Sequence, residues 1–482
     1  MSVDTLTLLV RGTWLEWRRD RVAFGAMALL SLLLVTTAIV QFDEARREAA
    51  HRAEHQAEAD AAFEAQPDRH PHRMVHYGHY VFRTPAPLAV LDPGIDPYTG
   101  RSIFLEGHRR NTETFAQAGE TSLLGRFGSF SPAFVVQTLV PLALILVGAG
   151  SIVGERVRGT ALVLFAQGLA PGRLFLGKAA ALFLLAMAAL LPMVLVGALL
   201  VMRGQEAWAP VALVLGGHLL YLLLWVICIL VVSAVAGSMR TALSALLVCW
   251  ALLVVLAPRL AAEAAAAAVP VPPRTHVDIE VAQALRTLGD SHDAADRNFD
   301  DFRQQVLAQY GVARIEDLPV NFRGLVAERG EAQGAEVMNR FASERQWRER
   351  EQARVLHRFA WLSPLLAVRH LSMAAAGTDL VNHHRFVDAA EAYRFDFVQR
   401  LNRLHAEALT LADDLARSRD AQAEQRTRIS AENWARMPDF SFEVAPAVER
   451  VRASLPLAGV LFLWTLAATA LLALVRRRVV GL

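Results

Sequence analysis

The chain has 482 residues, of which 54% are hydrophobic, and its formal net charge is +2. The apolar residues gather in runs of about 20, the length of helix that crosses a hydrocarbon core roughly 30 Å thick. A small net charge without a long basic tract argues against a nucleic-acid-binding protein. Both cysteines, Cys228 and Cys249, lie inside apolar runs, so the polar parts have no cysteine for a disulfide.

Residues 1–21 form a short amphipathic segment ahead of the first apolar run. Tryptophans and charged residues alternate in it, as Trp14, Glu16, Trp17 and Arg18. This composition is typical of a helix that lies at the membrane–water interface. Residues 22–41 are then the first predicted transmembrane helix. A cleaved signal peptide is the competing interpretation, but the run is long for a signal core and no small-x-small cleavage site follows it.

Five further apolar runs have the length of a membrane span. They cover residues 132–153, 178–202, 210–236, 241–258 and 454–475. A charged segment, 154–177, separates the second run from the third, and a basic tail, 476–482, follows the last. The sequence therefore predicts an all-α polytopic membrane protein with six transmembrane helices.

Two long polar inserts follow the first and fifth spans. The first, residues 42–130, opens with a helical stretch and continues through proline-rich turns, which predicts a loop-rich piece of a soluble domain. The second, residues 259–453, has a 4-3 apolar spacing in two places, from Val281 to Val306 and from Phe397 to Leu415. This spacing predicts a mainly α-helical insert with two long helices packed as an antiparallel pair.

The stretch between these two helices contains residues that favour turns. We expect looser connections at Asn321, Gly324, Gly330 and Gly334. Ordinary amphipathic helices in a helical domain are the preferred interpretation, and an extended coiled-coil arm is the alternative.

Charge bias predicts the orientation in the membrane. Six spans put both termini on one side, and most arginines near the ends of the spans fall on that side, as in the basic tail Arg476, Arg477 and Arg478. By the positive-inside rule this side is the cytosol, so the expected location is a bacterial inner membrane with both termini cytosolic. Both polar inserts are then extracytoplasmic.

Three motifs are candidates for chemistry. Residues Gly172 to Lys178 match the first seven positions of a phosphate-binding loop, but Ala179 replaces the hydroxyl residue and no strand precedes the motif. We interpret this match as chance. No nucleophile elbow, zinc-protease motif or paired cysteine motif occurs. We therefore expect no catalytic residue and no enzyme activity in the chain itself.

Histidine gives the other two candidates. His70, His72, His76 and His79 form a cluster that neutral imidazoles could turn into a Zn²⁺ or Cu²⁺ site, joined in space by His108, His383 or His384. Their spacings are not a standard zinc pattern, so a surface loop without a metal is the preferred interpretation. His218 lies inside a predicted span, where either a transport role or a simple bond to a neighbouring helix is open.

The charged segment after the second span is the strongest functional signal. Glu155, Arg156 and Arg158 precede Gly159 and Thr160, and Arg173 and the only lysine, Lys178, follow before the third span. Charges between two membrane helices predict a docking surface through which a partner moves those helices. The alternative is that they only fix the topology.

The sequence resembles the membrane subunit of an ABC transporter of the ABC-2 type. The resemblance rests on the segment Trp14 to Arg21, on Gly154-Glu155-Arg156 to Gly159-Thr160, and on Pro171-Gly172-Arg173 with Gly177-Lys178. Further likeness, to a branch with large uncharacterised extracytoplasmic inserts, comes from His76 to Arg83, Leu91 to Gly94 and Leu371 to Leu380.

The resemblance implies a permease subunit that couples a separate cytosolic ATPase to substrate movement. ATP and Mg²⁺ would be bound by that ATPase, with no cofactor in this chain. The expected partners are the ATPase, a second permease subunit in a homodimer or heterodimer, membrane lipid and, in one interpretation, a periplasmic protein. A non-transporting machine that acts on a periplasmic protein or cofactor is the first alternative, and a membrane scaffold or sensor is the second. The substrate stays open.

Overall fold

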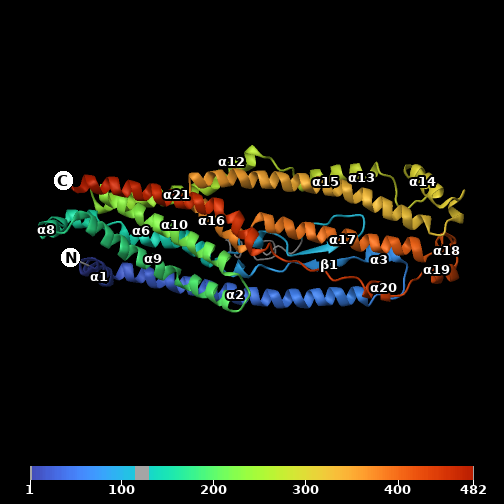
Figure 1. Ribbon diagram of the computed structural model, residues 1–482, viewed down its shortest axis with the longest axis horizontal. Helices are drawn as coiled ribbons and strands as arrows, with labels where there is room; N and C mark the ends of the chain where they lie inside the picture. Colours follow the sequence, from blue (N-terminus) through green and yellow to red (C-terminus); the bar gives the residue numbers. More distant parts are fainter. Residues whose placement is uncertain (1–2, 114–129, 481–482) are drawn as a thin grey trace.

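The computed structural model describes residues 3–113 and 130–480. The molecule is elongated, with the apolar helices at one end and a polar domain at the other (Figure 1). Both termini lie at the apolar end, together with helix α8 (Thr160–Ala166). We call this end the terminal face. The polar domain consists of the second half of helix α2 (Arg21–Glu64), the chain that follows it, and most of residues 269–446.

Six helical stretches in the described chain are long and apolar enough to cross a membrane. The structure is therefore that of a helical, multi-pass membrane protein. The stretches are α2; α5 (Pro132–Phe134) with the π-helical η4 (Val135–Leu139), α6 (Val140–Gly148) and α7 (Val153–Val157); α9 (Pro171–Met202); α10 (Trp208–Val235); α11 (Met239–Trp250) with the π-helical η5 (Ala251–Leu256) and α12 (Ala257–Ala268); and α21 (Ala447–Val480).

Several of these helices are longer than the apolar runs that predict them. The run 22–41 is only the first half of α2, whose 44 residues extend over about 66 Å at 1.5 Å per residue. The helix continues because the boundary at Gln41, Phe42 and Asp43 contains neither glycine nor proline. Helix α9 begins at Pro171, seven residues before the predicted start, because proline fits the first turn of a helix.

A pair of long helices forms the centre of the polar domain. Helix α15 (Phe322–Arg358) packs along α17 (Leu380–Ala408), and Phe397 and Leu401 of α17 are buried in a cluster with Phe63 of α2 and Met74 of α3 (Pro71–Tyr77). The expected turn residues Gly324, Gly330 and Gly334 lie inside α15, and Asn321 caps its start, so the prediction of looser connections there is wrong. At Gly324 a Cβ atom would lie 2.3 Å from the backbone nitrogen of Ala406, which shows that close helix contact requires this glycine.

The other predicted long helix, through Val281 and Val306, is broken in the structure. Helix α13 (Arg274–Arg286) ends before Gly289, which has a left-handed φ of +89°, and α14 (Asp300–Tyr310) starts a new helix. Between them, aspartates accept hydrogen bonds from backbone N–H groups, as Asp290 does from His292. These local bonds compete with the helix and explain the break.

Two strands add to the helical fold. Strand β1 (His79–Phe82) pairs antiparallel with β2 (Ser102–Leu105), with His79 opposite Leu105 and Phe82 opposite Ser102. Helix α3 (Pro71–Tyr77) precedes β1. The remaining short elements are η1 (Pro87–Val90), η2 (Asp96–Tyr98), η6 (Arg297–Phe299), η7 (Ile315–Asp317), η8 (Phe359–Trp361), α18 (Leu411–Ala416), α19 (Ala421–Arg426) and α20 (Glu432–Ala435).

Helix α16 (Pro364–Ala376) lies where the sequence predicts only polar insert. It packs against α10 and α21, and Leu366, Val368 and Leu371 belong to the same hydrophobic core as the membrane helices. With 13 residues it is too short to be read as a span from the sequence. The second insert therefore returns into the apolar end of the molecule.

Candidate functional site

The segment between the second and third spans forms two short helices at the terminal face. Helix α7 ends at Val157 and α8 begins at Thr160, with Gly159 between them at a φ of +74°. Among the described residues, no side chain or backbone atom from elsewhere lies within 4 Å of a Cβ built at Gly159. This glycine is therefore required for the turn and not for close packing.

Four charged side chains meet beside this turn and form what we call the ionic cluster. The Lys178 Nζ atom on α9 lies 2.8 Å from the Glu155 carboxylate on α7 and 3.6 Å from that of Glu16 on α1 (Val3–Arg19). The Arg158 guanidinium lies 2.9 Å from Glu16 and 3.8 Å from Glu155. The cluster joins the predicted docking segment to the predicted interfacial helix and to the third span.

Burial divides the cluster into an inner and an outer part. The side chains of Lys178 and Glu155 are only 7% and 12% exposed, whereas Arg158 and Glu16 are about half exposed. Thr160 also donates hydrogen bonds to Glu155. The contacts of Glu155 are thus to other residues of this chain. Arg158, another of the predicted docking residues, is about half exposed to solvent.

Arg156 has a structural role at the end of the fourth span. Its guanidinium donates to the carbonyl oxygens of Ala234, at 2.7 Å, and of Ala236. These groups lie at the C-terminus of α10, where a positive charge is favourable. Ser233 accepts hydrogen bonds from the backbone N–H groups of Ile152 and Val153 at the same place. Helix α7 is therefore fixed to α10 by side chains on both.

The exposed surface of this segment is more apolar than the sequence suggests. Val157, Leu162 and Val163 are 64%, 72% and 56% exposed, and the predicted docking residues Thr160 and Arg173 are exposed beside them. The sequence does not single out these three apolar residues, because in it they look like the ends of the neighbouring spans. The exposed surface at α7 and α8 is thus apolar with basic residues.

Helix α1 lies against the third span. A Cβ atom at Gly177 would lie 2.7 Å from that of Leu9, so α1 and α9 are in close contact. Trp14 and Trp17 lie with ring centroids 6.1 Å apart, and Trp14 and Arg18 are exposed. The candidate phosphate-binding motif Gly172 to Lys178 forms the first turns of α9, and its lysine is held by carboxylates. A helix with a paired lysine does not cradle phosphate.

His218 lies fully buried inside the fourth span. Its Nδ1 atom donates to the Val214 carbonyl at 2.7 Å, and its Nε2 atom lies 3.1 Å from the Gln137 amide nitrogen on η4. Both ring nitrogens are therefore satisfied. This geometry is that of a neutral histidine bonded to a neighbouring helix, the simpler of the two interpretations.

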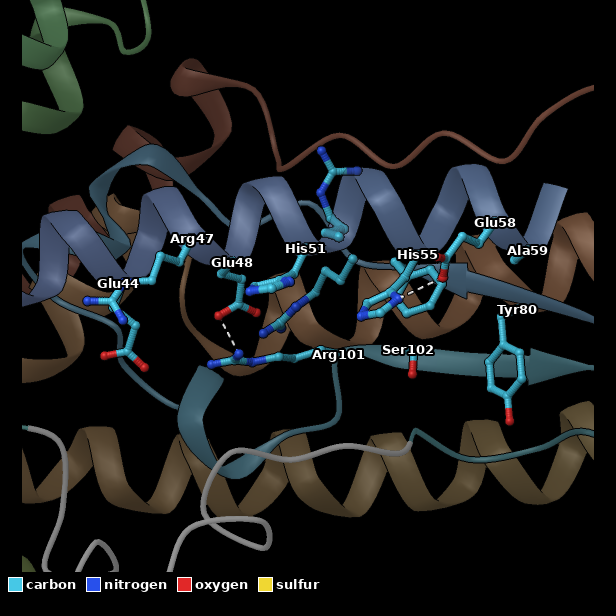
Figure 2. Close-up of a pocket in the computed structure, with 13 residues that line it drawn as sticks. Glu44, Arg47, Glu48, His51, His55, Glu58, Ala59, Tyr80, Arg101 and Ser102 are labelled. Carbon is cyan, nitrogen blue, oxygen red and sulfur yellow. Dashed lines mark hydrogen bonds and ion pairs between the residues drawn. The ribbon is translucent and has the colours of Figure 1, made fainter. Parts of the chain in front are cut away.

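A groove in the polar domain is a second candidate site, which the sequence did not predict. It has a volume of about 820 Å³ and lies between one face of α2 and the strands β1 and β2. Figure 2 shows the ion pair between Glu48 on α2 and Arg101 at the edge of this groove. Three kinds of group line it: carboxylates, basic side chains and aromatic rings, as in Glu44, Arg52 and Tyr80. A ligand with both charged and apolar groups matches this lining.

The histidines of the predicted cluster are divided by the structure. His70 to Tyr77 form the cap and body of α3 and not a surface loop, and His70 is buried. His79 turns to Asp60 on α2, at 2.9 Å. His72 and His76 lie beside His108 and beside His292, which the sequence did not connect with them.

Three other histidines do not belong to this group. His383 pairs with Glu113 and His384 with Glu349, away from His72. His70 meets His405 and Asp414 in a separate buried group.

Comparison with known protein families gives a match in the polar domain. Residues 278–443 match the family model described as a domain of unknown function, DUF3526. The matched segment contains α15 to α20 and thus includes the central helix pair. A search among curated proteins finds no match to the chain.

Proposed function

We propose that this chain is the permease subunit of an ABC-2 type transporter, which acts with a separate cytosolic ATPase and a second permease subunit. The observation that carries the proposal is the ionic cluster. It ties the α7–α8 segment to α1 and α9, while Arg156 ties the same segment to α10. A partner that displaces α7 and α8 would therefore also displace the spans α9 and α10 and the helix α1.

The terminal face would lie in the cytosol of a bacterial inner membrane in this proposal. The exposed apolar side chains of Val157, Leu162 and Val163 would enter a groove on the ATPase, with Arg158 and Arg173 at the rim. Buried apolar contacts provide most of the affinity of such an interface, and charges at its edge guide association. ATP and Mg²⁺ would be bound by the partner.

A second candidate is a machine that moves the polar domain instead of a substrate. The continuity of α2 favours it, because one helix connects the terminal face with the groove beside Glu48. A tilt of α2 in the membrane would change the position of its far half against β1 and β2. In this case the groove would hold part of a periplasmic protein or cofactor.

The docking surface can be tested by site-specific crosslinking. We would place cysteine at Leu162, in full-length protein with Cys228 and Cys249 replaced by serine, and crosslink it in native membranes. The matched control is Ile279→Cys, because Ile279 is similarly exposed but lies on α13 in the polar domain. We expect Leu162→Cys to capture a protein with an ATP-binding motif and Ile279→Cys not to.

A second measurement tests coupling. Leu162→Glu should abolish the stimulation of the captured ATPase while the amount of protein in the membrane stays normal, and Ile279→Glu should leave the stimulation unchanged. Absence of an ATPase from the Leu162→Cys crosslinks, or full stimulation by Leu162→Glu, would overturn the proposal. ATPase stimulation without accumulation of any transported compound in vesicles would favour the second candidate.

A further inference from the structure

Four histidines meet where the two polar inserts touch each other. His72 and His76 lie one turn apart on α3, His108 follows β2, and His292 lies in the loop after α13. One ligand atom from each lies within 4.8 Å of the others. The Nε2 atoms of His72 and His76 are 3.2 Å apart, close to the roughly 3.3 Å that separates nitrogens around a tetrahedral Zn²⁺ with Zn–N bonds of about 2.0–2.1 Å.

Carboxylates orient two of these rings from behind. The Nδ1 atom of His108 lies 3.1 Å from Glu331, and that of His292 lies 3.0 Å from Asp290. A carboxylate on one ring nitrogen leaves the other, Nε2, free as a ligand and raises its basicity. Glu331 is itself held by Arg394 at 2.6 Å. The arrangement is the carboxylate–histidine pattern found around protein-bound metals.

The backbone at His108 supports the same interpretation. Its φ of +62° makes it the one non-glycine residue with positive φ in the described chain. The Glu331 carboxylate accepts a hydrogen bond from the backbone N–H of His108 as well as facing its ring. A backbone in this sparsely populated region is retained when the surroundings fix it, and such residues concentrate at functional sites.

The ring nitrogens are available to a ligand. The His108 Nε2 atom is buried and has no hydrogen-bond partner in the described part of the chain, and the Nε2 atoms of His72 and His76 face each other. A surface hollow lined by His72, His76 and Glu424 gives access from solvent.

The neighbouring group of His70, His405 and Asp414 has a different character. Asp414 contacts Arg323 at 3.3 Å and Arg417 at 3.1 Å, and it accepts a hydrogen bond from Asn321. The two guanidinium groups already supply the positive charge that a metal would bring. This group is a buried hydrogen-bonded ion cluster. It differs from the four histidines, whose carboxylate contacts among the described residues are to the Nδ1 atoms of His108 and His292.

We propose that His72, His76, His108 and His292 bind one Zn²⁺ or Cu²⁺ ion per chain. Imidazole ligands suit both ions, and a set with neither thiolate nor carboxylate in the inner shell disfavours Ca²⁺ and Mg²⁺. The ion would join α3 and the chain after β2 to the loop after α13, and so hold the two inserts together. The proposal does not depend on the proposed permease function.

Metal binding can be measured on the full-length protein in lipid nanodiscs without a polyhistidine tag. After removal of metal with a chelator, Zn²⁺ and Cu²⁺ are titrated by equilibrium dialysis, and Co²⁺ serves as a spectroscopic probe of the ligand geometry. We expect one ion per chain, and a rise in unfolding temperature on binding. The double variant His76→Ala/His292→Ala should lose both. The control His51→Ala/His55→Ala removes two exposed histidines with the same one-turn spacing as His72 and His76, and should keep both.

A second pair of variants tests the site without removing a ligand. Asp290→Asn removes the carboxylate behind His292 and should weaken binding about 10-fold or more. Asp293→Asn in the same loop should leave affinity unchanged, because Asp293 bonds the backbone of Ala295 and not a histidine. Equal metal binding by the wild type and His76→Ala/His292→Ala would overturn the proposal. If that variant does not fold, equal affinity of Asp290→Asn and Asp293→Asn would overturn it instead.

Discussion

Arg450 on α21 forms a bidentate ion pair with Glu206, which lies in the connection between α9 and α10. The two hydrogen bonds measure 2.6 and 2.9 Å, and both side chains are buried. Arg450 also donates to the carbonyl of Ala375 at the end of α16. One guanidinium thus joins three parts of the molecule where the spans meet the polar domain.

Removing the charge of Glu206 should strongly destabilise the protein. In Glu206→Gln the buried Arg450 loses its counter-charge, which costs about 3–5 kcal/mol when one partner of a buried pair is removed. Thermal unfolding in detergent measures the loss. Glu449→Gln is the matched control, because Glu449 directly precedes Arg450 in the sequence and pairs with Arg385 at an exposed site. A similar stability for both variants would contradict a structural role for the buried pair.

The ionic cluster should behave as a coupled unit. Lys178→Glu places a third carboxylate beside Glu155 and Glu16, and Glu155→Lys places a third cation beside Lys178 and Arg158. The exchange variant Glu155→Lys/Lys178→Glu restores an opposite pair and should recover part of the loss. In a double-mutant cycle on unfolding we expect a coupling of roughly 0.5–3 kcal/mol. Additive losses would show that the two side chains do not interact.

The contact between α15 and α17 predicts opposite effects for two glycines in one helix. Gly324→Ala would place a Cβ atom 2.3 Å from the backbone of Ala406, and we expect a loss of about 1–3 kcal/mol or more from overpacking. At Gly334 the nearest atom would be 3.7 Å away, so Gly334→Ala should stabilise the helix by roughly 0.5–1 kcal/mol. Equal effects in unfolding experiments would argue against the close packing.

Acid should destabilise the polar domain through Asp414. Burial alone would raise the pKa of Asp414, but hydrogen bonds with His405 and His70 and the charge of Arg323 outweigh it and lower the pKa below the ordinary 3.8. Because the folded-state pKa is the lower one, the stabilisation is present above pH 3.8 and is lost as the pH falls below it. Asp414→Asn should be less stable and lack this acid dependence, measured as unfolding temperature against pH. Asp413→Asn, at the neighbouring half-buried position, should retain the dependence on Asp414.

The sequence predicts the membrane helices well because the bilayer dictates a minimum apolar length. The ends of the helices are less predictable, since α2 continues past Gln41 into polar sequence with no residue to stop it. The predicted helix pair is not the observed one, because α17 packs along α15, which lies in the stretch expected between the two predicted helices, and α17 ends at Ala408 before Leu415. The burial of Phe397 follows from its spacing, whereas the break at Gly289 depends on local backbone bonds that periodicity does not report.

The candidate sites show the same division. Glu155 and Arg158 are visible in the sequence as charges between apolar runs, but their partner Glu16 lies on a separate helix. His292 could not be linked with His72, because the loop that carries it reaches α3 only through the fold of the second insert. Local sequence patterns identify residues that could bind a partner or a metal, and the tertiary structure decides which of them lie together.

The position of α16 also sets an order for assembly. Its apolar surface is covered by α10, which is made before it, and by α21, which is the last helix of the described chain. Until α21 has entered the membrane, Leu371 and its neighbours lack one of their covering helices, and the Ser454 hydroxyl that bonds the Leu371 carbonyl is not in place. The second insert therefore cannot complete its folding during synthesis of its own residues. A fragment cut at residues 259 and 453 would carry an uncovered apolar helix into water and aggregate.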